Sequence, residues 1–259
     1  MKHHIIHLQI WQMVAAYLFI VFLLAVVKWR KIPRLKEISI STIRMTGQLI
    51  IVGFLLIYLF KHPNPWLTVL VILIMEAFAV YNVYKQVKTP LSNQLKKVVA
   101  FSLVTGTIIS LIFFNFVVIR FSPWFNPRYF IPIAGMLIGN AMTGVTLGVN
   151  SLVNDMDKLR HKVEVALMLG ATTREASKEF VDEAFAAAVL PTINKMVGMG
   201  IVFLPGMMTG VILSGTSPLV AVEYQIAIML GIAGSVSLSV ILFVQLGYQS
   251  FFNSRSQLQ

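Results

Sequence analysis

Seven long apolar stretches constrain what this chain can fold into. A helix needs about 20 mostly apolar residues to cross the hydrocarbon core of a bilayer. The apolar residues run continuously rather than in alternation, which indicates helices and not the strands of a barrel. We therefore predict an all-α integral membrane protein with about seven transmembrane helices, at Leu8–Val27, Thr42–Phe60, Trp66–Tyr84, Val98–Ile119, Tyr129–Val153, Thr192–Leu213 and Tyr224–Gly247.

The scarcity of charge supports this assignment. Of the 259 residues 57% are hydrophobic and 12% are charged, whereas soluble domains are about 25% charged. Lipid is therefore expected to cover much of the surface. The first apolar stretch follows a single Lys2 and precedes no small-residue cleavage pattern, so we expect it to remain in the protein. We interpret residues 1–259 as one transmembrane domain, multi-pass in the inner (plasma) membrane.

The basic residues predict the orientation. Cytoplasmic loops of membrane proteins are enriched in Lys and Arg. Here 17 of the 21 basic residues fall in the first, third and fifth connections, at the start of the second and sixth stretches, and in the tail. They are Lys28, Arg30, Lys31, Arg34, Lys36, Arg44, Lys85, Lys88, Lys96, Lys97, Lys158, Arg160, Lys162, Arg174, Lys178, Lys195 and Arg255. The N-terminus is thus predicted outside and the C-terminus in the cytoplasm. The same asymmetry explains the net charge of +11 without a nucleic-acid partner.

The fifth connection, residues 154–191, is long enough to hold structure and carries seven of the ten acidic residues. We expect it to lie in the cytoplasm as two helices around Gly170, a residue typical of helix ends. Asn154 and Asp155 are expected to cap the first helix. Thr172 and Glu175 have the spacing of a capping box for the second helix. Pro191 is expected to end that second helix.

Leu159, Val163 and Leu167 recur every four residues and form one apolar stripe. Two interpretations are open. The stripe belongs to a surface helix along the underside of the protein itself, or it docks into a groove on a cytoplasmic partner. A short helix tied to spans at both ends can transmit a partner's motion to those spans.

Two resemblances favour the partner. Glu164-Val165-Ala166 followed by Gly170-Ala171 resembles the cytoplasmic EAA loop of ABC importer permeases, which docks on an ATPase subunit. The Ile-x-Leu-Pro of that pattern is not matched, because Phe180 stands at the Ile position and Leu190-Pro191 comes later. The apolar stripe and this resemblance together predict the ATPase-coupling residues, which are Leu159, Val163, Glu164, Ala166, Leu167 and Gly170.

A second resemblance covers nearly the whole chain. Its motifs are Gly139-Asn140-Ala141-Met142, Leu169-Gly170-Ala171-Thr172, the run Leu204 to Gly210 (Leu-Pro-Gly-Met-Met-Thr-Gly), and Tyr224-Gln225-Ile226 with Met229. These are similar to the FetB-type family of iron-export ABC transporter permeases of bacteria, which has plant relatives linked to aluminium tolerance. The resemblance implies metal-ion export, a separately encoded ATPase, and an assembly of two permeases with two ATPases.

No Gly-x4-Gly-Lys-Ser/Thr phosphate loop occurs in the chain. ATP and Mg are therefore expected on the partner subunit, and this chain is predicted to be a non-catalytic membrane subunit. There are no cysteines, which excludes disulfides and thiolate metal sites.

Candidate pathway residues lie within the spans. Glu76 is near the middle of the third stretch, where a carboxylate is costly unless it is paired, protonated or hydrated. Arg44 and Lys195 are its candidate partners. Asn140 lies inside a family-like motif. Met207 and Met208, together with Met196 and Met199, offer thioethers that suit soft metal ions or simply fill gaps. His3, His4 and His7 form a weak candidate metal site or a solvated tail, so the metal ligands stay unknown.

Glycines spaced by four allow helix backbones to approach closely. They either pack helices within one subunit or form the seam of a homodimer that lines the pathway. The pairs are Gly135 and Gly139, Gly144 and Gly148, and Gly206 and Gly210.

Two other function classes remain. A seven-helix receptor or sensor would have the same orientation, but the last stretch contains no lysine for a retinal Schiff base. An intramembrane enzyme would need paired Asp, Ser-His or His-rich motifs within the spans, and none occurs there.

Overall fold

The computed structural model describes residues 9–87, 89–202, 204–253 and 255–258. The candidate histidines 3, 4 and 7 lie outside these residues. The structure divides into two units, which we describe separately. One comprises the described part of Met1–His62 with Leu213–Gly215, and the other comprises Pro63–Ile212 and Thr216 to the end of the described chain.

The first unit is a helical hairpin of α1 (Ile10–Trp29) and α2 (Leu35–Lys61). A hydrogen bond of 2.5 Å joins the Tyr17 hydroxyl on α1 to the Thr46 hydroxyl on α2. Most apolar side chains of both helices are exposed. This is typical of helices whose surroundings are lipid rather than protein.

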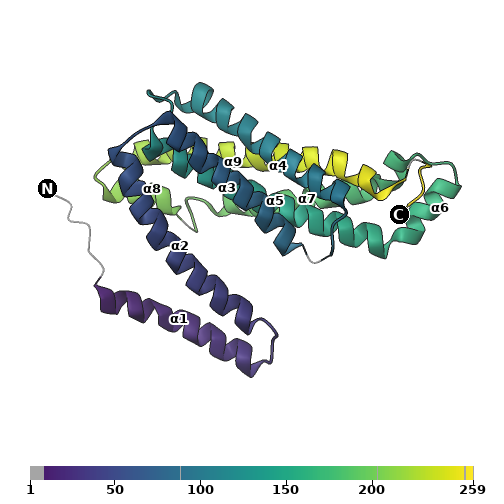
Figure 1. Cartoon of the computed structure of the whole chain (residues 1–259), viewed down its shortest axis with the longest axis horizontal. Helices are drawn as coiled ribbons and strands as arrows, with labels where there is room; N and C mark the ends of the chain where they lie inside the picture. The colour runs from purple at the N-terminus through teal and green to yellow at the C-terminus, as the bar shows by residue number, and fades with distance from the viewer. Residues whose placement is uncertain (1–8, 88, 203, 254, 259) are drawn as a thin grey trace. The chain divides into compact units, whose positions relative to one another are not determined.

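The second unit is a helical bundle in which α5 packs against α3, α4, α7 and α9 (Figure 1). Its buried core consists mainly of Val, Leu, Ile, Ala and Phe side chains, most of them from these five helices. The elements are α3 (Pro65–Gln86), α4 (Asn93–Phe113), the π-helical η1 (Phe114–Ile119), α5 (Pro127–Lys158), α6 (Arg160–Met168), α7 (Thr173–Gly198), α8 (Gly206–Leu213), α9 (Pro218–Gly247) and the 3-10 helix η2 (Tyr248–Phe251).

Capping residues in the sequence explain where these helices begin. The Asn64 side chain accepts a hydrogen bond from the Trp66 amide at the start of α3. Asn126 does the same for the Arg128 amide of α5, and both helices have proline at their first position. Such caps satisfy amides that have no partner inside the helix, and proline has no amide to satisfy there.

Six helices of the described chain are long and apolar enough to span a membrane. Five of the seven predicted stretches fall on helices with close to the expected bounds, and the second falls within the longer α2. The stretch Thr192–Leu213 is different, because it is not one continuous helix. Helix α7 ends at Gly198 and α8 begins at Gly206. Gly200 between them has a φ of 83°, and Pro205 lacks the amide that a helix needs.

The bounds of the connection 154–191 also differ from the sequence-based prediction. Asn154 and Asp155 do not cap a new helix, because α5 continues through them to Lys158. Pro191 does not end the second helix either, since it lies inside α7. Helix α7 is therefore one rod of 26 residues that joins the polar connection to the apolar stretch beyond it.

Close approach of α4 and α9 depends on small residues at matched positions. A Cβ on Gly106 would lie 2.6 Å from the Cα of Ser239, and a Cβ on Gly231 would lie 2.7 Å from the Phe114 ring. These two pairs define an antiparallel register.

Replacement of Gly106 by alanine should destabilise the bundle. The added methyl group meets the backbone of Ser239 rather than a movable side chain end, and overpacking of this kind costs about 1–3 kcal/mol. Thermal unfolding of the detergent-solubilised protein measures the effect. Gly234→Ala is the matched control on α9, because no atom lies within 4 Å of its added Cβ. Equal unfolding temperatures for the two variants would contradict the packing described here.

Candidate functional site

Helix α6 ends in a turn at Gly170, as the sequence predicts. The amide of Gly170 donates to the Leu167 carbonyl and the amide of Ala171 donates to the Ala166 carbonyl, each at 3.0 Å. This is the hydrogen-bond pattern of a Schellman motif. This motif requires a residue in the left-handed backbone conformation, and Gly170 has a φ of 92°. The turn fixes the direction in which α7 leaves α6.

The predicted stripe of α6 faces the protein's own core. Val163 is fully buried, and Leu159 and Leu167 are half-buried and pack against the core cluster. The apolar side chains that face outward are others. Val165 is 53% exposed, and Met168 and Leu169 are each 83% exposed. We call Val165, Met168 and Leu169 the α6 tip.

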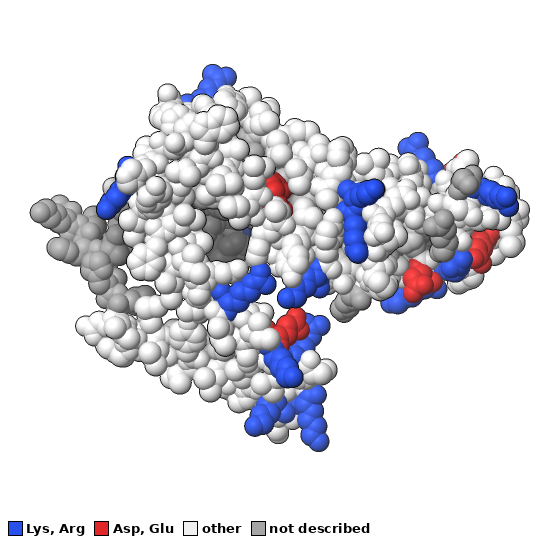
Figure 2. Space-filling view, viewed as in Figure 1, with Lys and Arg blue, Asp and Glu red and all other residues white. Residues whose placement is uncertain are grey.

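Charged groups surround the α6 tip. Arg160 pairs with Glu164 at 2.8 Å, and Lys162 pairs with Glu179 of α7 at 3.7 Å. Figure 2 shows lysine, arginine and acidic side chains gathered at the end of the molecule that holds α6. This end of the bundle is therefore suited to water and to a partner protein rather than to lipid.

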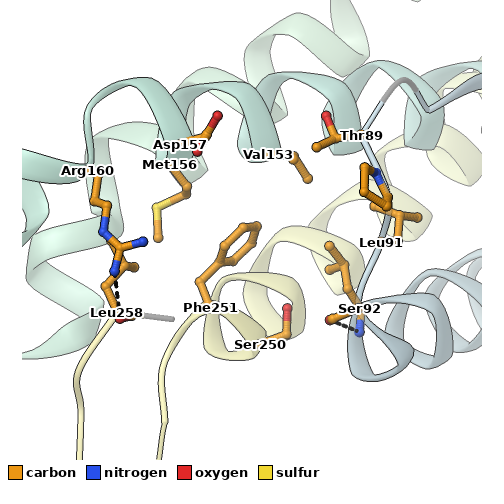
Figure 3. Close-up of a pocket in the computed structure, with 12 residues that line it drawn as sticks. Thr89, Leu91, Ser92, Val153, Met156, Asp157, Arg160, Ser250, Phe251 and Leu258 are labelled. Carbon is orange, nitrogen blue, oxygen red and sulfur yellow. Dashed lines mark hydrogen bonds between the residues drawn. The ribbon is translucent and has the colours of Figure 1, made fainter.

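A pocket of about 260 Å³ lies beside the start of α6. Figure 3 shows Phe251 pointing into it, with Asp157 and Arg160 on one side and the 89–92 segment on the other. The Nη2 group of Arg160 donates a hydrogen bond to the Leu258 carbonyl at 3.0 Å. The end of the described chain is thereby joined to α6, a contact that sequence spacing did not indicate.

Thr172 and Glu175 form the predicted capping box at the start of α7. The Glu175 carboxylate accepts hydrogen bonds from the Thr172 amide at 2.8 Å and from the Thr172 hydroxyl at 2.7 Å. The Glu175 amide donates to the Thr172 hydroxyl oxygen at 3.2 Å. The bond from the backbone amide, with that from the hydroxyl, lowers the pKa of Glu175 below its usual range.

Glu76 is buried between α3 and α4, with 3% of its surface exposed. The Thr107 hydroxyl of α4 donates to Glu76 Oε1 at 2.5 Å. Glu76 Oε2 is buried and has no hydrogen-bond partner. The ion pairs of the described residues do not include Glu76. Its partner in this unit is thus Thr107, and the expected pairing with Lys195 is wrong, whereas the pairing with Arg44 stays a prediction.

Lys195 instead contacts Asn140. The Lys195 Nζ on α7 donates to Asn140 Oδ1 on α5 at 2.7 Å. The Asn140 amide donates to the Met136 carbonyl at 2.7 Å. Asn140 is half-buried and Lys195 is exposed. Two of the residues that the sequence singled out are therefore brought together, while Glu76 is held separately by α4.

The glycine pairs occupy different surroundings. A Cβ on Gly144 would lie 2.8 Å from Val236, and one on Gly148 would lie 3.4 Å from Ala188, so this pair packs α5 against α9 and α7. A Cβ on Gly135 would lie 3.2 Å from the Met75 methyl. Nothing lies within 4 Å of the positions that a Cβ would take on Gly139, Gly206 or Gly210.

Met207 and Met208 are half-buried in α8. Met207 packs against the core, and Met199 lies 3.8 Å from the Gln225 amide. Within the described ranges, no group of three or more His, Asp or Glu side chains is arranged to hold a metal ion.

Comparison with known proteins assigns the family. Residues 10–252 match the model of the family described as Uncharacterised protein family (UPF0014). The chain belongs to this family. No solved structure matches the chain.

Three relatives resemble the chain over most of its length. It is 33% identical to the Probable iron export permease protein FetB of Escherichia coli (strain K12), over 94% of this chain and 92% of the relative. It is 35% identical to Protein ALUMINUM SENSITIVE 3 of Arabidopsis thaliana, over 95% and 88%. It is 34% identical to the UPF0014 membrane protein slr1647 of Synechocystis sp. (strain ATCC 27184 / PCC 6803 / Kazusa), over 91% and 90%. The FetB-type resemblance is thereby confirmed, and the chain is a multi-pass membrane protein.

Replacement of Glu175 by glutamine should loosen the first turn of α7 in a pH-dependent way. The folded-state pKa of Glu175 is lowered, so its stabilising effect is full above its ordinary pKa of 4.5 and is lost as the pH falls through the folded value. Hydrogen-exchange protection of residues 173–176 should therefore be lower in Glu175→Gln than in the wild type at pH 7. The two should converge at acidic pH, and a difference that persists there would contradict the capping role.

Proposed function

We propose that this chain is the membrane subunit of an ABC transporter that exports iron or a related metal ion, driven by ATP hydrolysis on a separate subunit. Support for metal export comes from the Escherichia coli relative, which is named a probable iron export permease. Two copies of this chain would assemble with two ATPase subunits, which hold the ATP and Mg. The protein would lie in the inner (plasma) membrane and serve metal homeostasis or resistance.

The α6 tip is the observation that carries the ATPase assignment. A helix of nine residues, bent sharply into α7 at Gly170, presents exposed apolar side chains among charged ones. Exposed apolar groups with a polar rim are typical of protein interfaces. In the orientation that the basic residues predict, this end lies in the cytoplasm, where an ATPase subunit would meet it.

The contact residues proposed for the ATPase differ from those implied by the stripe. Val163 is fully buried and Leu159 and Leu167 pack inward, so they position α6 rather than touch a partner. Val165, Met168 and Leu169 are the side chains available for docking. Glu164, Ala166 and Gly170 would set the shape of this surface.

Crosslinking tests the docking surface, and the chain has no native cysteine to interfere. Met168→Cys and Leu169→Cys should each crosslink to an ATPase that carries a phosphate loop, because both side chains are exposed at the α6 tip. The readout is the mass of the crosslinked peptide pair. Val163→Cys is the matched control on the same helix and should give no crosslink. Failure of all tip positions in membranes that contain the ATPase would overturn the proposed coupling.

Glu76 is proposed to act in transport because one carboxylate oxygen has no partner in this conformation. Burying a carboxylate oxygen without a partner costs free energy. A conformation that separates α3 from α4 would remove this cost and expose the carboxylate. Glu76→Gln should therefore abolish metal export while the amount of protein in the membrane stays normal. Metal content of cells expressing each variant measures this, with Thr107→Val as a test of the hydrogen bond alone. Unchanged export in Glu76→Gln would remove Glu76 from the mechanism.

A further inference from the structure

One face of α5 carries a mostly polar stripe that no other element of the second unit covers completely. Its residues recur at alternating intervals of three and four, so they share one side of the helix. Thr143 and Leu147 are exposed, and the other members are half-buried. The α5 stripe consists of Asn140, Thr143, Leu147, Asn150 and Asn154.

The opposite face of α5 is the packed one. Ala141, Val145 and Val149 are fully buried there, and Gly144 and Gly148 contact α9 and α7. The α5 stripe is therefore not a second core surface within this chain. It is a polar surface on a helix that is long and apolar enough to span a membrane.

Asn140, the first residue of the α5 stripe, lies at membrane depth. Arg128 and Asp155 are the charged residues of α5 nearest to Asn140 on either side. They lie about 18 Å and about 22 Å away along a helix that rises 1.5 Å per residue. The hydrocarbon core is about 30 Å thick, so Asn140 falls in its central part. Lys195 reaches this level, because its Nζ is 2.7 Å from Asn140 Oδ1.

An exposed lysine and several amides at this depth are disfavoured against lipid. Such groups normally face the interior of a bundle or a water-filled cavity. We propose that the α5 stripe and Lys195 line the water-filled translocation path, and that Lys195 makes this path select substrates of net negative charge.

The sign of the charge that faces the α5 stripe follows from the charged residues at the depth of Asn140. Near the level of Asn140, the helices α3, α4, α5, α7 and α9 carry two charged residues, Glu76 and Lys195. Glu223 lies near the start of α9, far from Val236, which packs beside Gly144 of α5. Glu76 is held by Thr107 on α4 and is buried. The ion pairs of the described residues leave Lys195 bonded to a neutral amide. In this conformation the charge that faces the stripe is therefore positive.

A bare metal cation would be repelled by this group, whereas a metal ion held by several carboxylates or phosphates would be attracted. The inference rests on the proposed transport function and names its substrate class: an anionic metal complex. Asn140 positions the ammonium group, and the remaining amides of the stripe offer hydrogen bonds to oxygen atoms of the complex.

Charge-selective thiol labelling tests the proposal in the cysteine-free chain. Thr143→Cys and Asn150→Cys are treated in membranes with a negatively charged methanethiosulfonate and with a positively charged one. Each rate is divided by the rate of the same reagent with a free thiol in solution. The exposed apolar positions Ile74→Cys on α3 and Phe101→Cys on α4 serve as lipid-facing controls.

Both stripe positions should react much faster than the controls, and the normalised ratio of anionic to cationic rates should exceed one. Adding Lys195→Met or Lys195→Gln should lower that ratio at least about threefold, since one nearby unit charge is removed. Lys195→Arg should preserve it. Labelling rates equal to those of the controls would overturn the proposal. So would a ratio of anionic to cationic rates that does not change when Lys195 is replaced by Met or Gln.

The labelling does not require an ATPase, so its outcome is separable from that of the crosslinking at the α6 tip. Anion-selective labelling without an ATPase crosslink would reject the proposed coupling to an ATPase while keeping the polar path. A crosslink without such labelling would reject the path and its charge selectivity while keeping the transporter.

Discussion

Water is absent from the hydrocarbon core of a membrane, so each polar group of a spanning helix has to find its partner within the protein. Three asparagines of this chain show how that is achieved, whereas the buried side chain of Asn115 has no hydrogen-bond partner. The side-chain amides of Asn82, Asn140 and Asn150 each donate to the carbonyl four residues earlier in their own helix, at 2.7 to 2.9 Å. Each asparagine keeps its side-chain oxygen for another partner. At Asn140 that partner is Lys195.

The same constraint explains the packing of α4 on α9. Apolar side chains gain little from leaving lipid for protein, so helices associate through close contact of small residues. Gly106 against Ser239 and Phe114 against Gly231 provide that contact. The hydroxyls of Ser102, Ser235 and Ser239 are buried without a hydrogen-bond partner. These serines therefore contribute by their small size more than by hydrogen bonding.

Much of the fold could be predicted because apolar length and turn residues are local properties. The spanning helices, the glycine turn at Gly170 and the capping box at Thr172 follow from residues within a few positions of one another. The predictions that failed concern features that depend on contacts between residues far apart in the sequence or on the course of the backbone. The apolar length of 192–213 concealed a break at Gly200 and Pro205. The period of Leu159, Val163 and Leu167 showed that they share a face, but it could not show that the protein's own core covers that face. The partner of Glu76 was missed because a threonine carries no charge pattern to reveal it.

Helix α7 connects the two candidate sites mechanically. It starts at the capping box beside the α6 tip and continues unbroken past Pro191 to Gly198. Lys195 therefore lies about 33 Å from the start of the same rod. The Gly170 turn fixes α6 to this rod, and the contacts of α7 with Gly144 and Gly148 guide it along α5. A packed helix moves as a unit by sliding or tilting rather than by bending freely. Force applied by an ATPase at the α6 tip would thus arrive as a displacement of Lys195 relative to Asn140, in the polar stripe where the substrate is proposed to pass.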